Sequence, residues 1–364
     1  MKISTTKESF LNAVLLGEKI VGKKESLPVL SCVLIDVGSQ CVIRATNLEA
    51  GIEIVLPCDI QEVGIVAVRA NILTQTLRAI SGDKVVISLE DGNLIVESRG
   101  TRTLIKAVPH EEFPKLNAAQ GGDVMVSRAD FLRSMHSVSY AASPSMIRPE
   151  LGSVYISVSQ GSVTAVATDS FRLAEKVVPT TRNKGDVDLL IPLKHAQELS
   201  HILEASSTDE LHLTTNESQM SVRINGIVYT SRIIEGTFPN YKEIVPKTFE
   251  TEATLIKADF AEMLRKARVF SGSDQHVGLH IYPKKKIFSA TAQSADVGEM
   301  SDTLDAALKG EDLDINFHIG YLSDCLPVVE SDSITLHFAG PGKPLVVRGA
   351  SDTTFRYLVM PLNR

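Results

Sequence analysis

An internal repeat is the feature that most constrains how this chain can fold. Phe10, Phe131 and Phe260 each follow a strand-like stretch and lie in a helix-like one, at intervals of about 125 residues. The second and third of these phenylalanines also share the preceding Ala-Asp. In a chain of 364 residues, this spacing predicts three copies of one domain.

Further landmarks recur at the same interval. Alternating strands are predicted to end on Ala-Thr pairs at Ala45-Thr46, Ala167-Thr168 and Ala290-Thr291. Hairpin tips are predicted at 91–92, 216–217 and 340–341. A strand that ends at a proline is predicted at the close of each copy, after Phe113, Phe238 and Met360. These landmarks predict domains at 1–120, 121–247 and 248–364.

Each copy is expected to be mostly antiparallel sheet with two helices. Apolar residues alternate along segments such as Ile52, Ile54 and Leu56, as they do in half-buried strands. One helix is predicted near each marker phenylalanine, and a second is predicted at 71–81, 192–205 and 318–331. The predicted fold class is therefore α+β, in three tandem copies of a two-helix, mostly antiparallel β domain.

Positive charge gathers on the predicted helices, although the formal net charge is −7. A solvated helix surface could carry the same residues, but the sign repeats at equivalent positions in an acidic chain. This segregation indicates a basic face for sequence-independent contact with phosphates, and the absence of Trp favours a duplex over a single strand. The basic residues on these helices and in the loop after the first are Lys19, Lys23, Lys24, Arg78, Arg128, Arg133, Lys194, Lys257, Arg265, Lys266 and Arg268.

No catalytic or metal-binding motif accompanies this face. The sequence lacks GxxxxGK[ST], GxSxG and HExxH, and the glycines at 340–342 read as a hairpin tip rather than a phosphate loop. His276 and His280 are four apart, but in a strand-like stretch that favours structural roles over metal ligation. We expect a non-enzymatic protein with no cofactor and no metal.

The cysteines and the N-terminal segment indicate the compartment. Cys32, Cys41, Cys58 and Cys325 show no CxxC spacing, which favours free thiols over disulfides or zinc ligands. The first residues lack a signal-peptide pattern, and the apolar run near residues 11–21 is interrupted by polar residues. We expect a cytoplasmic protein without a membrane partner.

The final residues raise a separate question, because apolar side chains continue almost to the end as "YLVMPL". Together with "LPVLSCVLI", "VATDSFRLA" and "GTFPNYKEIVP", this ending resembles the β subunit of bacterial DNA polymerase III, the sliding clamp, across essentially the whole chain. The resemblance implies a head-to-tail dimeric ring of six domains, with twelve helices around duplex DNA.

The resemblance also implies a hydrophobic groove between the second and third domains that captures short motifs from partner proteins. Two departures from the family pattern are Ser170-Phe171, where the family often has Gly-His, and Glu243, where it often has a basic residue. Both are expected to alter which partner motifs bind. The implied groove residues are Leu151, Thr168, Ser170, Phe171, Arg172, Leu173, Pro239, Ile244, Leu358, Val359, Met360, Pro361 and Leu362.

The DNA-facing surface and the ring joint follow from the same resemblance. The joint is expected to pair Val269 and Phe270 of one chain with Ile72 and Ile105 of the next, beside Thr103, where some members of the family have an aromatic residue. The expected DNA-facing residues are Lys19, Lys23, Lys24, Arg78, Arg133, Arg148, Lys194, Arg265 and Lys266.

The partners that the resemblance implies are double-stranded DNA, a second copy of the chain, the DNA polymerase III catalytic subunit, an ATP-driven clamp loader, and other polymerases and repair factors. Two alternatives stay open from the residues themselves. One is a cytoplasmic α+β enzyme whose basic face holds an anionic substrate, although no catalytic cluster is evident. The other is a monomeric peptide-binding scaffold that has the groove but forms no ring.

Overall fold

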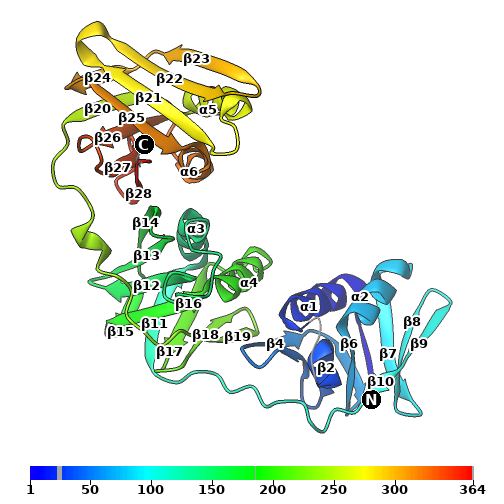
Figure 1. Ribbon diagram of the computed structural model, residues 1–364. Coiled ribbons are helices and arrows are strands. Elements are labelled where there is room, and N and C mark those ends of the chain that lie inside the picture. The colour runs from blue at the N-terminus through cyan, green and yellow to red at the C-terminus, as the bar shows by residue number, and fades with distance from the viewer. Residues whose placement is uncertain (23–26, 185, 363–364) are drawn as a thin grey trace. The chain divides into compact units, whose positions relative to one another are not determined.

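The computed structural model describes residues 1–22, 27–184 and 186–362, and the chain divides into two compact units. Unit 1 comprises residues 1–129, 180–187 and 194–235, and unit 2 comprises residues 130–179, 188–193 and 236–364. Unit 1 contains a five-stranded and a ten-stranded sheet, and unit 2 contains a nine-stranded and a four-stranded sheet, apart from one residue at the start of β16 (Figure 1). The three domain boundaries stay a prediction.

The order of elements confirms the predicted α+β fold in three copies. In the described residues, each copy runs through a strand and a first helix, four strands, a fifth strand that leads into a second helix, and three closing strands. The short strand β10 is an addition in the first copy. The first helices are α1 (Lys7–Ile20), α3 (Arg128–Ser139) and α5 (Lys257–Phe270), and the second helices are α2 (Ala70–Ala79), α4 (Leu193–Glu204) and α6 (Ile319–Asp324).

The marker phenylalanines anchor the first helices. Phe10, Phe131 and Phe260 are almost completely buried, and burying each ring stabilises the fold by about 1.5–3 kcal/mol. Helix α6 is shorter than the predicted span because Pro327 lacks an amide donor, and the chain continues there as the 3-10 turn η4 (Leu326–Val328).

The two sheets of unit 1 are antiparallel. The five-stranded sheet contains, in spatial order, β5 (Asp59–Glu62), β1 (Lys2–Thr6), β7 (Lys84–Glu90), β8 (Asn93–Ser98) and β9 (Thr101–Ile105). The ten-stranded sheet contains β10 (Ala107–Val108), β6 (Gly64–Arg69), β2 (Cys32–Val37), β3 (Cys41–Thr46), β4 (Ala50–Leu56), β19 (Ile227–Arg232), β18 (Gln219–Ile224), β17 (Glu210–Thr215), β11 (Gly122–Ser127) and β15 (Arg182–Lys184).

In unit 2, as in unit 1, the large sheet contains strands of two copies and the small sheet contains strands of one copy. The nine-stranded sheet contains β16 (Val187–Pro192), β12 (Ser153–Ser159), β13 (Ser162–Thr168), β14 (Arg172–Pro179), β28 (Phe355–Val359), β27 (Leu345–Gly349), β26 (Ser333–Phe338), β20 (Thr251–Ile256) and β24 (Ala307–Gly310). The four-stranded sheet contains β23 (Gly298–Leu304), β22 (Ile287–Ser294), β21 (His276–Tyr282) and β25 (Leu313–His318).

Strands of neighbouring copies pair with each other at two places. In the first joint, β4 of copy one pairs with β19 of copy two, and in the second joint, β14 of copy two pairs with β28 of copy three. The equivalent strands at the two ends of the repeat, β9 and β23, are edge strands of their sheets. Each copy therefore joins the next by continuing a sheet. In the described residues, β9 and β23 have no strand of a neighbouring copy beside them.

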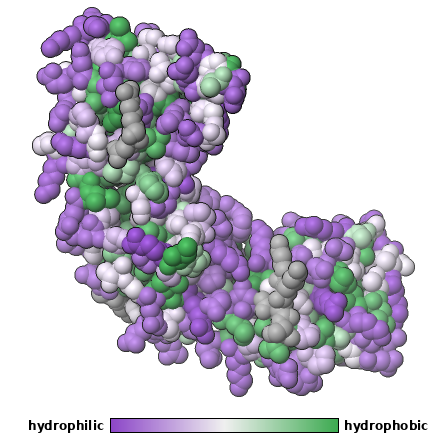
Figure 2. Space-filling view, viewed as in Figure 1, coloured by the Kyte–Doolittle hydropathy of each residue, from purple (hydrophilic) through white to green (hydrophobic). Residues whose placement is uncertain are grey.

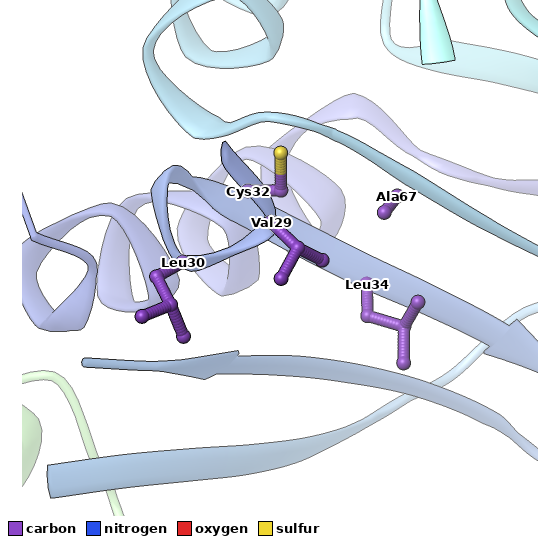
Figure 3. Packing of buried hydrophobic residues seen from close by; sticks show 5 residues of the cluster. All are labelled: Val29, Leu30, Cys32, Leu34 and Ala67. Atoms are coloured by element: carbon purple, nitrogen blue, oxygen red, sulfur yellow. The ribbon is translucent and has the colours of Figure 1, made fainter. Parts of the chain in front are cut away.

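Buried aliphatic side chains form the core between helix and sheet. The turn η1 (Pro28–Ser31) inserts Val29 and Leu30 beside Cys32 and Leu34 of β2, with Ala67 of β6 completing the cluster (Figure 3). On the face shown in Figure 2, polar residues predominate and apolar residues form separate patches. None of the helices in the described ranges has the length and apolar character needed to cross a lipid bilayer.

The hairpin landmarks lie where expected, but three predicted strand ends do not. Phe113 and Phe238 lie in loops, because β10 ends at Val108 and β19 ends at Arg232. The three hairpin tips connect β7 to β8, β17 to β18 and β26 to β27. Thr46 and Thr168 end their strands, but the third pair does not, because β22 continues to Ser294 through its pairing with β23. The four cysteines are free, as predicted, and burial together with neighbouring Cys58 raises the pKa of the Cys41 thiol to about 12.

Buried ion pairs fix the register of the second joint. Lys176 of β14 is only 2% exposed, and its Nζ lies 3.0 Å from Oδ2 of Asp352. The neighbouring residue Glu175 lies opposite Arg356 of β28 and forms an ion pair with it. Because successive strand residues face opposite sides, one pair lies on each face of the sheet. A slip of one residue would leave buried charges without partners.

We predict that Lys176→Ala lowers the free energy of unfolding by about 3 kcal/mol, because the partly buried Asp352 carboxylate loses its counter-charge. Urea unfolding of the full chain measures this change. The exposed Lys309→Ala on β24 is the matched control, with an expected effect within about 0.5 kcal/mol. Equal stabilities for the two variants would contradict the role of the ion pair.

Candidate partner-binding groove

A surface groove of about 280 Å³ lies in unit 2 beside the second joint. Ten of the thirteen predicted groove residues line it, and they come from four separate segments of the chain. The structure adds Arg148, Asn240 and Tyr241 to this lining. The ten predicted residues are Leu151, Thr168, Ser170, Phe171, Arg172, Leu173, Pro239, Ile244, Leu358 and Met360.

The loop between β13 and β14 is held by its own side chains. Thr168 Oγ1 donates to the Arg172 carbonyl at 2.6 Å and accepts from the Ser170 amide at 3.1 Å. Asp169 Oδ1 accepts from the amides of Phe171 and Arg172 at 2.9 and 3.0 Å. These bonds fold the backbone tightly and leave the Phe171 ring 60% exposed at the groove.

Ser170 occupies a backbone conformation that favours glycine. Its φ is +81°, in the left-handed region where a Cβ is strained. The equivalent residue in the first copy, Leu48, has φ +75° within a loop held in the same way by Thr46 and Asn47. This explains physically why glycine suits the position.

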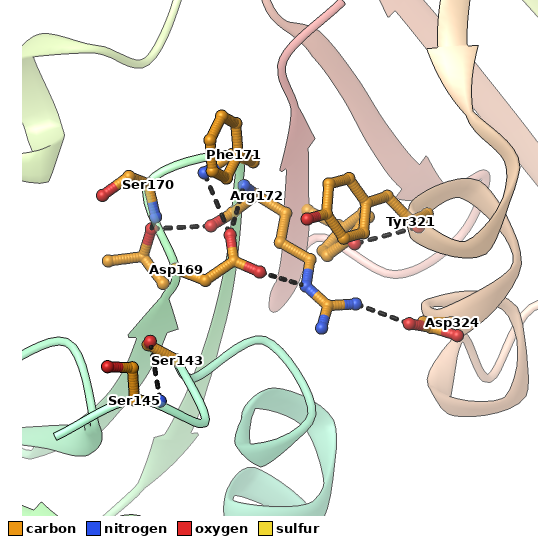
Figure 4. Close-up of polar contacts among 10 residues, drawn as sticks. Ser143, Ser145, Asp169, Ser170, Phe171, Arg172, Tyr321 and Asp324 are labelled. Carbon is orange, nitrogen blue, oxygen red and sulfur yellow. Dashed lines mark hydrogen bonds and ion pairs between the residues drawn. The ribbon is translucent and has the colours of Figure 1, made fainter. Parts of the chain in front are cut away.

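Arg172 ties the loop to helix α6. Its Nε lies 2.9 Å from Oδ2 of Asp169, its Nη1 lies 2.5 Å from Oδ2 of Asp324, and its guanidinium lies over the Tyr321 ring at 4.7 Å (Figure 4). Burial alone would lower the pKa of Arg172, but Tyr357 and the two carboxylates raise it above the ordinary value. The guanidinium therefore stays charged, and two carboxylates already neutralise it.

The segment after β19 forms a second wall. The Phe238 ring stacks on Tyr155 at 4.9 Å, and Tyr241 begins the 3-10 turn η2 (Tyr241–Glu243). Burial and the Glu175 carboxylate raise the pKa of Tyr241, so its hydroxyl stays neutral. The Asn240 amide donates to Glu243 at 2.6 Å and so fixes an acidic side chain beside the groove.

The C-terminal tail forms the third wall, with three corrections to the prediction. The Met360 amide donates to the Phe171 carbonyl at 2.8 Å, which places Met360 at the groove. Val359 is fully buried within β28 instead. Pro361 and Leu362 line a separate hollow of about 460 Å³, because the Leu362 amide donates to the Asn316 carbonyl on β25.

The first joint has the same backbone plan but a charged surface. There the Arg232 amide donates to the Glu49 carbonyl at 2.8 Å, as Met360 donates to Phe171. The two side chains that replace methionine and phenylalanine form an ion pair at 3.9 Å. The apolar surface at this position is thus specific to the second joint.

The space beside the paired strands is also filled differently at the two joints. Leu173 lines the groove at the second joint, and Gly51 is its counterpart on β4. A Cβ on Gly51 would lie only 2.5 Å from Cδ2 of Leu116, so a residue of the chain itself fills that space. Thr230 stands where the second joint has Leu358.

The predicted DNA-facing residues are mostly exposed but differ in their partners. Arg133 pairs with Asp130 and Glu330, Lys194 with Glu198, and Lys266 with Glu262 and Asp302. Arg148 lines the groove and pairs with Glu150. Within the described residues, no ion pair involves Lys19, Arg78 or Arg265, and Lys23 and Lys24 lie outside the described residues.

The predicted ring-joint residues include one correction. Ile72 is 41% exposed and Val269 is 62% exposed, while Phe270 is half-buried. Ile105 is 5% exposed and faces the core, whereas the neighbouring Leu104 is 44% exposed. The prediction for Ile105 was wrong by one residue, which in a strand means the opposite face.

Comparison with family models covers nearly all of the chain. The N-terminal, central and C-terminal domain models of the DNA polymerase III beta subunit match residues 1–117, 125–240 and 242–363. The chain belongs to the DNA polymerase III β subunit family. It is a sliding clamp, the non-catalytic processivity subunit, and not an enzyme.

Full-length relatives and solved structures agree with this membership. The beta sliding clamp of Streptococcus pneumoniae R6 is 26% identical over 99% of this chain and 98% of its own length, and that of Escherichia coli K12 is 22% identical over the full length of both. Crystal structures of the beta subunit from Thermotoga maritima and of the sliding clamp from Bacillus subtilis share the fold at TM-scores of 0.95 and 0.94. They are 23% and 22% identical and cover 100% of this chain and 99% of theirs.

We predict that Ser170→Gly raises the free energy of unfolding by about 0.5–1 kcal/mol, because glycine adopts positive φ without strain. Chemical denaturation compares it with Ser157→Gly in the middle of β12, where glycine is expected to cost up to about 1 kcal/mol. Destabilisation by both changes would contradict the proposed strain at Ser170.

Proposed function

We propose that two copies of this chain close head to tail into a ring around duplex DNA and tether replication partners through the groove. The observation that carries the ring is the pair of unpartnered edge strands, β9 and β23. They are the counterparts of the strands that pair at the two internal joints. A third joint of the same kind between two chains would satisfy both edges, and closed symmetry gives a ring.

The internal joints also supply a register for this third joint. Leu173 faces Leu358 at the second joint, and Gly51 faces Thr230 at the first. Leu173 and Gly51 each pair with the threonine that ends the preceding strand, and Thr291 of copy three pairs in the same way with Ser301 on β23. The counterpart of Leu358 and Thr230 is Leu104 on β9, by the pairing of each closing strand with the strand before it. The proposed joint therefore places Leu104 of one chain opposite Ser301 of the other.

A disulfide tests this register, because directly opposed strand residues have Cα atoms close enough to be bridged. We predict that Leu104→Cys with Ser301→Cys gives, on mild oxidation, a covalent dimer that runs at twice the mass of the 39.5 kDa chain in denaturing gels. Either single variant is the control. Failure of the double variant to cross-link, while sedimentation shows a dimer, would overturn the register; a monomer would overturn the ring.

The groove is proposed to hold a short apolar segment of the DNA polymerase III catalytic subunit, the clamp loader, or other polymerases and repair factors. Its walls offer Phe171, Ile244 and Met360 as exposed apolar side chains, and the positive charge of Arg172 is already paired with Asp169 and Asp324. Flexible and aromatic side chains suit a site that accepts several related segments. Glu243, fixed by Asn240, disfavours acidic residues at that end.

We predict that Met360→Ala weakens binding of a polymerase-derived peptide about tenfold, because an exposed apolar wall of the groove is lost. Leu362→Ala, two residues along in the separate hollow, is the matched control, with less than about a twofold effect expected. Fluorescence anisotropy of the labelled peptide measures both. Equal losses, or no loss in either variant, would refute the groove assignment.

The remaining parts of the proposal follow from the ring. Clamp domains at 1–120, 121–247 and 248–364 would give six per ring, with Lys19, Arg78 and Arg265 among the cations that face duplex phosphates. Contacts of this kind hold the backbone without reading sequence, which permits sliding. An ATP-driven loader would open the ring in the cytoplasm, where the chain finds its DNA.

A further inference from the structure

A second hollow, in unit 1, has a chemistry unlike that of the groove. It has a volume of about 730 Å³ and lies between α1, the end of α4 and the first joint. Its floor is apolar, with Leu16, Ile54 and Ile227 beside the partly exposed Val55. This volume lies in the range of small-molecule sites.

Basic side chains border this floor. Lys19 of α1 and Arg78 of α2 line the hollow and are exposed, and no ion pair within the described residues involves either of them. His201 and Glu204 of α4 form a contact of 3.1 Å with each other at the opposite side. The border therefore attracts negative charge next to an apolar surface.

The second joint shows that this hollow is not a necessary result of the fold. Asn12 lies two residues after Phe10, and its counterpart two residues after Phe131 is Arg133. Glu204 and Glu330 are also counterparts. The side chain of Arg128, which opens α3, donates to the carbonyl of Leu203, the residue before Glu204. The side chain of Lys257, which opens α5, donates in the same way to the carbonyl of Val329, the residue before Glu330.

In unit 2, Arg133 Nε lies 3.1 Å from Oε1 of Glu330 and bridges the gap between the helices. In unit 1, the short neutral side chain of Asn12 lines the hollow instead. The position that carries an ion pair between helices in unit 2 is thus taken by a short neutral side chain in unit 1.

From this geometry we propose that the hollow binds an organic anion, an acidic group joined to an apolar body. The acidic group binds Lys19 and Arg78, and the body covers Leu16, Ile54, Val55 and Ile227. This chemistry has two possible sources, a free amphiphilic acid or an unpaired nucleotide with its phosphate. The inference depends on neither the ring nor the groove, and it gives Lys19 and Arg78, two of the proposed DNA-facing cations, a second ligand.

The test uses the full chain and the fluorescent sulfonate 8-anilinonaphthalene-1-sulfonate as the probe. We expect saturable binding that Asn12→Arg weakens about tenfold, because the new side chain pairs with Glu204 and fills the hollow. Lys19→Gln with Arg78→Gln is expected to weaken binding about fivefold. Arg265→Gln on α5 is the matched control and leaves binding unchanged.

Competition identifies the source of the ligand. Displacement of the probe by decanoate assigns a free amphiphilic acid, and displacement by a short single-stranded oligonucleotide assigns an unpaired nucleotide. Absence of saturable binding, equal binding by Asn12→Arg and the parent chain, or displacement by neither competitor would overturn the proposal.

Discussion

Main-chain pairing between strands of neighbouring copies is the interaction on which the rest of this structure depends. The β4–β19 and β14–β28 pairings turn half-sheets of separate copies into continuous sheets. Each half-sheet alone would present an exposed edge of amides and carbonyls, which is costly to bury and prone to non-specific pairing. The strands β9 and β23, at the two ends of the three-copy repeat, keep such an exposed edge.

The groove is a consequence of one such joint. At both joints the residue after the closing strand donates its amide to a loop carbonyl, Arg232 to Glu49 and Met360 to Phe171. Each of these loops has a residue at positive φ just before that carbonyl, so the two joints have the same backbone arrangement. What differs is the side chains placed on that frame, apolar at Phe171 and Met360 and charged at Glu49 and Arg232. A repeated scaffold thus carries the apolar groove at one joint and not at the other, and the ion pairs of Lys176 and Glu175 hold that joint in register.

Sequence reasoning reached the repeat, the hairpins and most of the groove, because these depend on local chemistry and on a resemblance spread over the whole chain. It failed where the answer depends on a partner strand. Ile105 and Leu104 are both apolar, and only the pairing of β9 with β8 decides which faces the core. The same limit explains Val359, whose orientation follows from the pairing of β28, and Tyr241, which lies in "GTFPNYKEIVP" but is absent from the predicted groove. The merging of half-sheets across copies has no local signal at all.

Retention on circular DNA tests the central claim, topological enclosure by a ring, most directly. The chain is loaded onto nicked circular plasmid with its clamp loader and ATP, washed in moderate salt, and the plasmid is then linearised. The account predicts salt-resistant retention on the circle and release from the linear form, because a ring slides off an open end. Retention that salt abolishes and linearisation leaves unchanged would mean ordinary electrostatic binding and would contradict the ring.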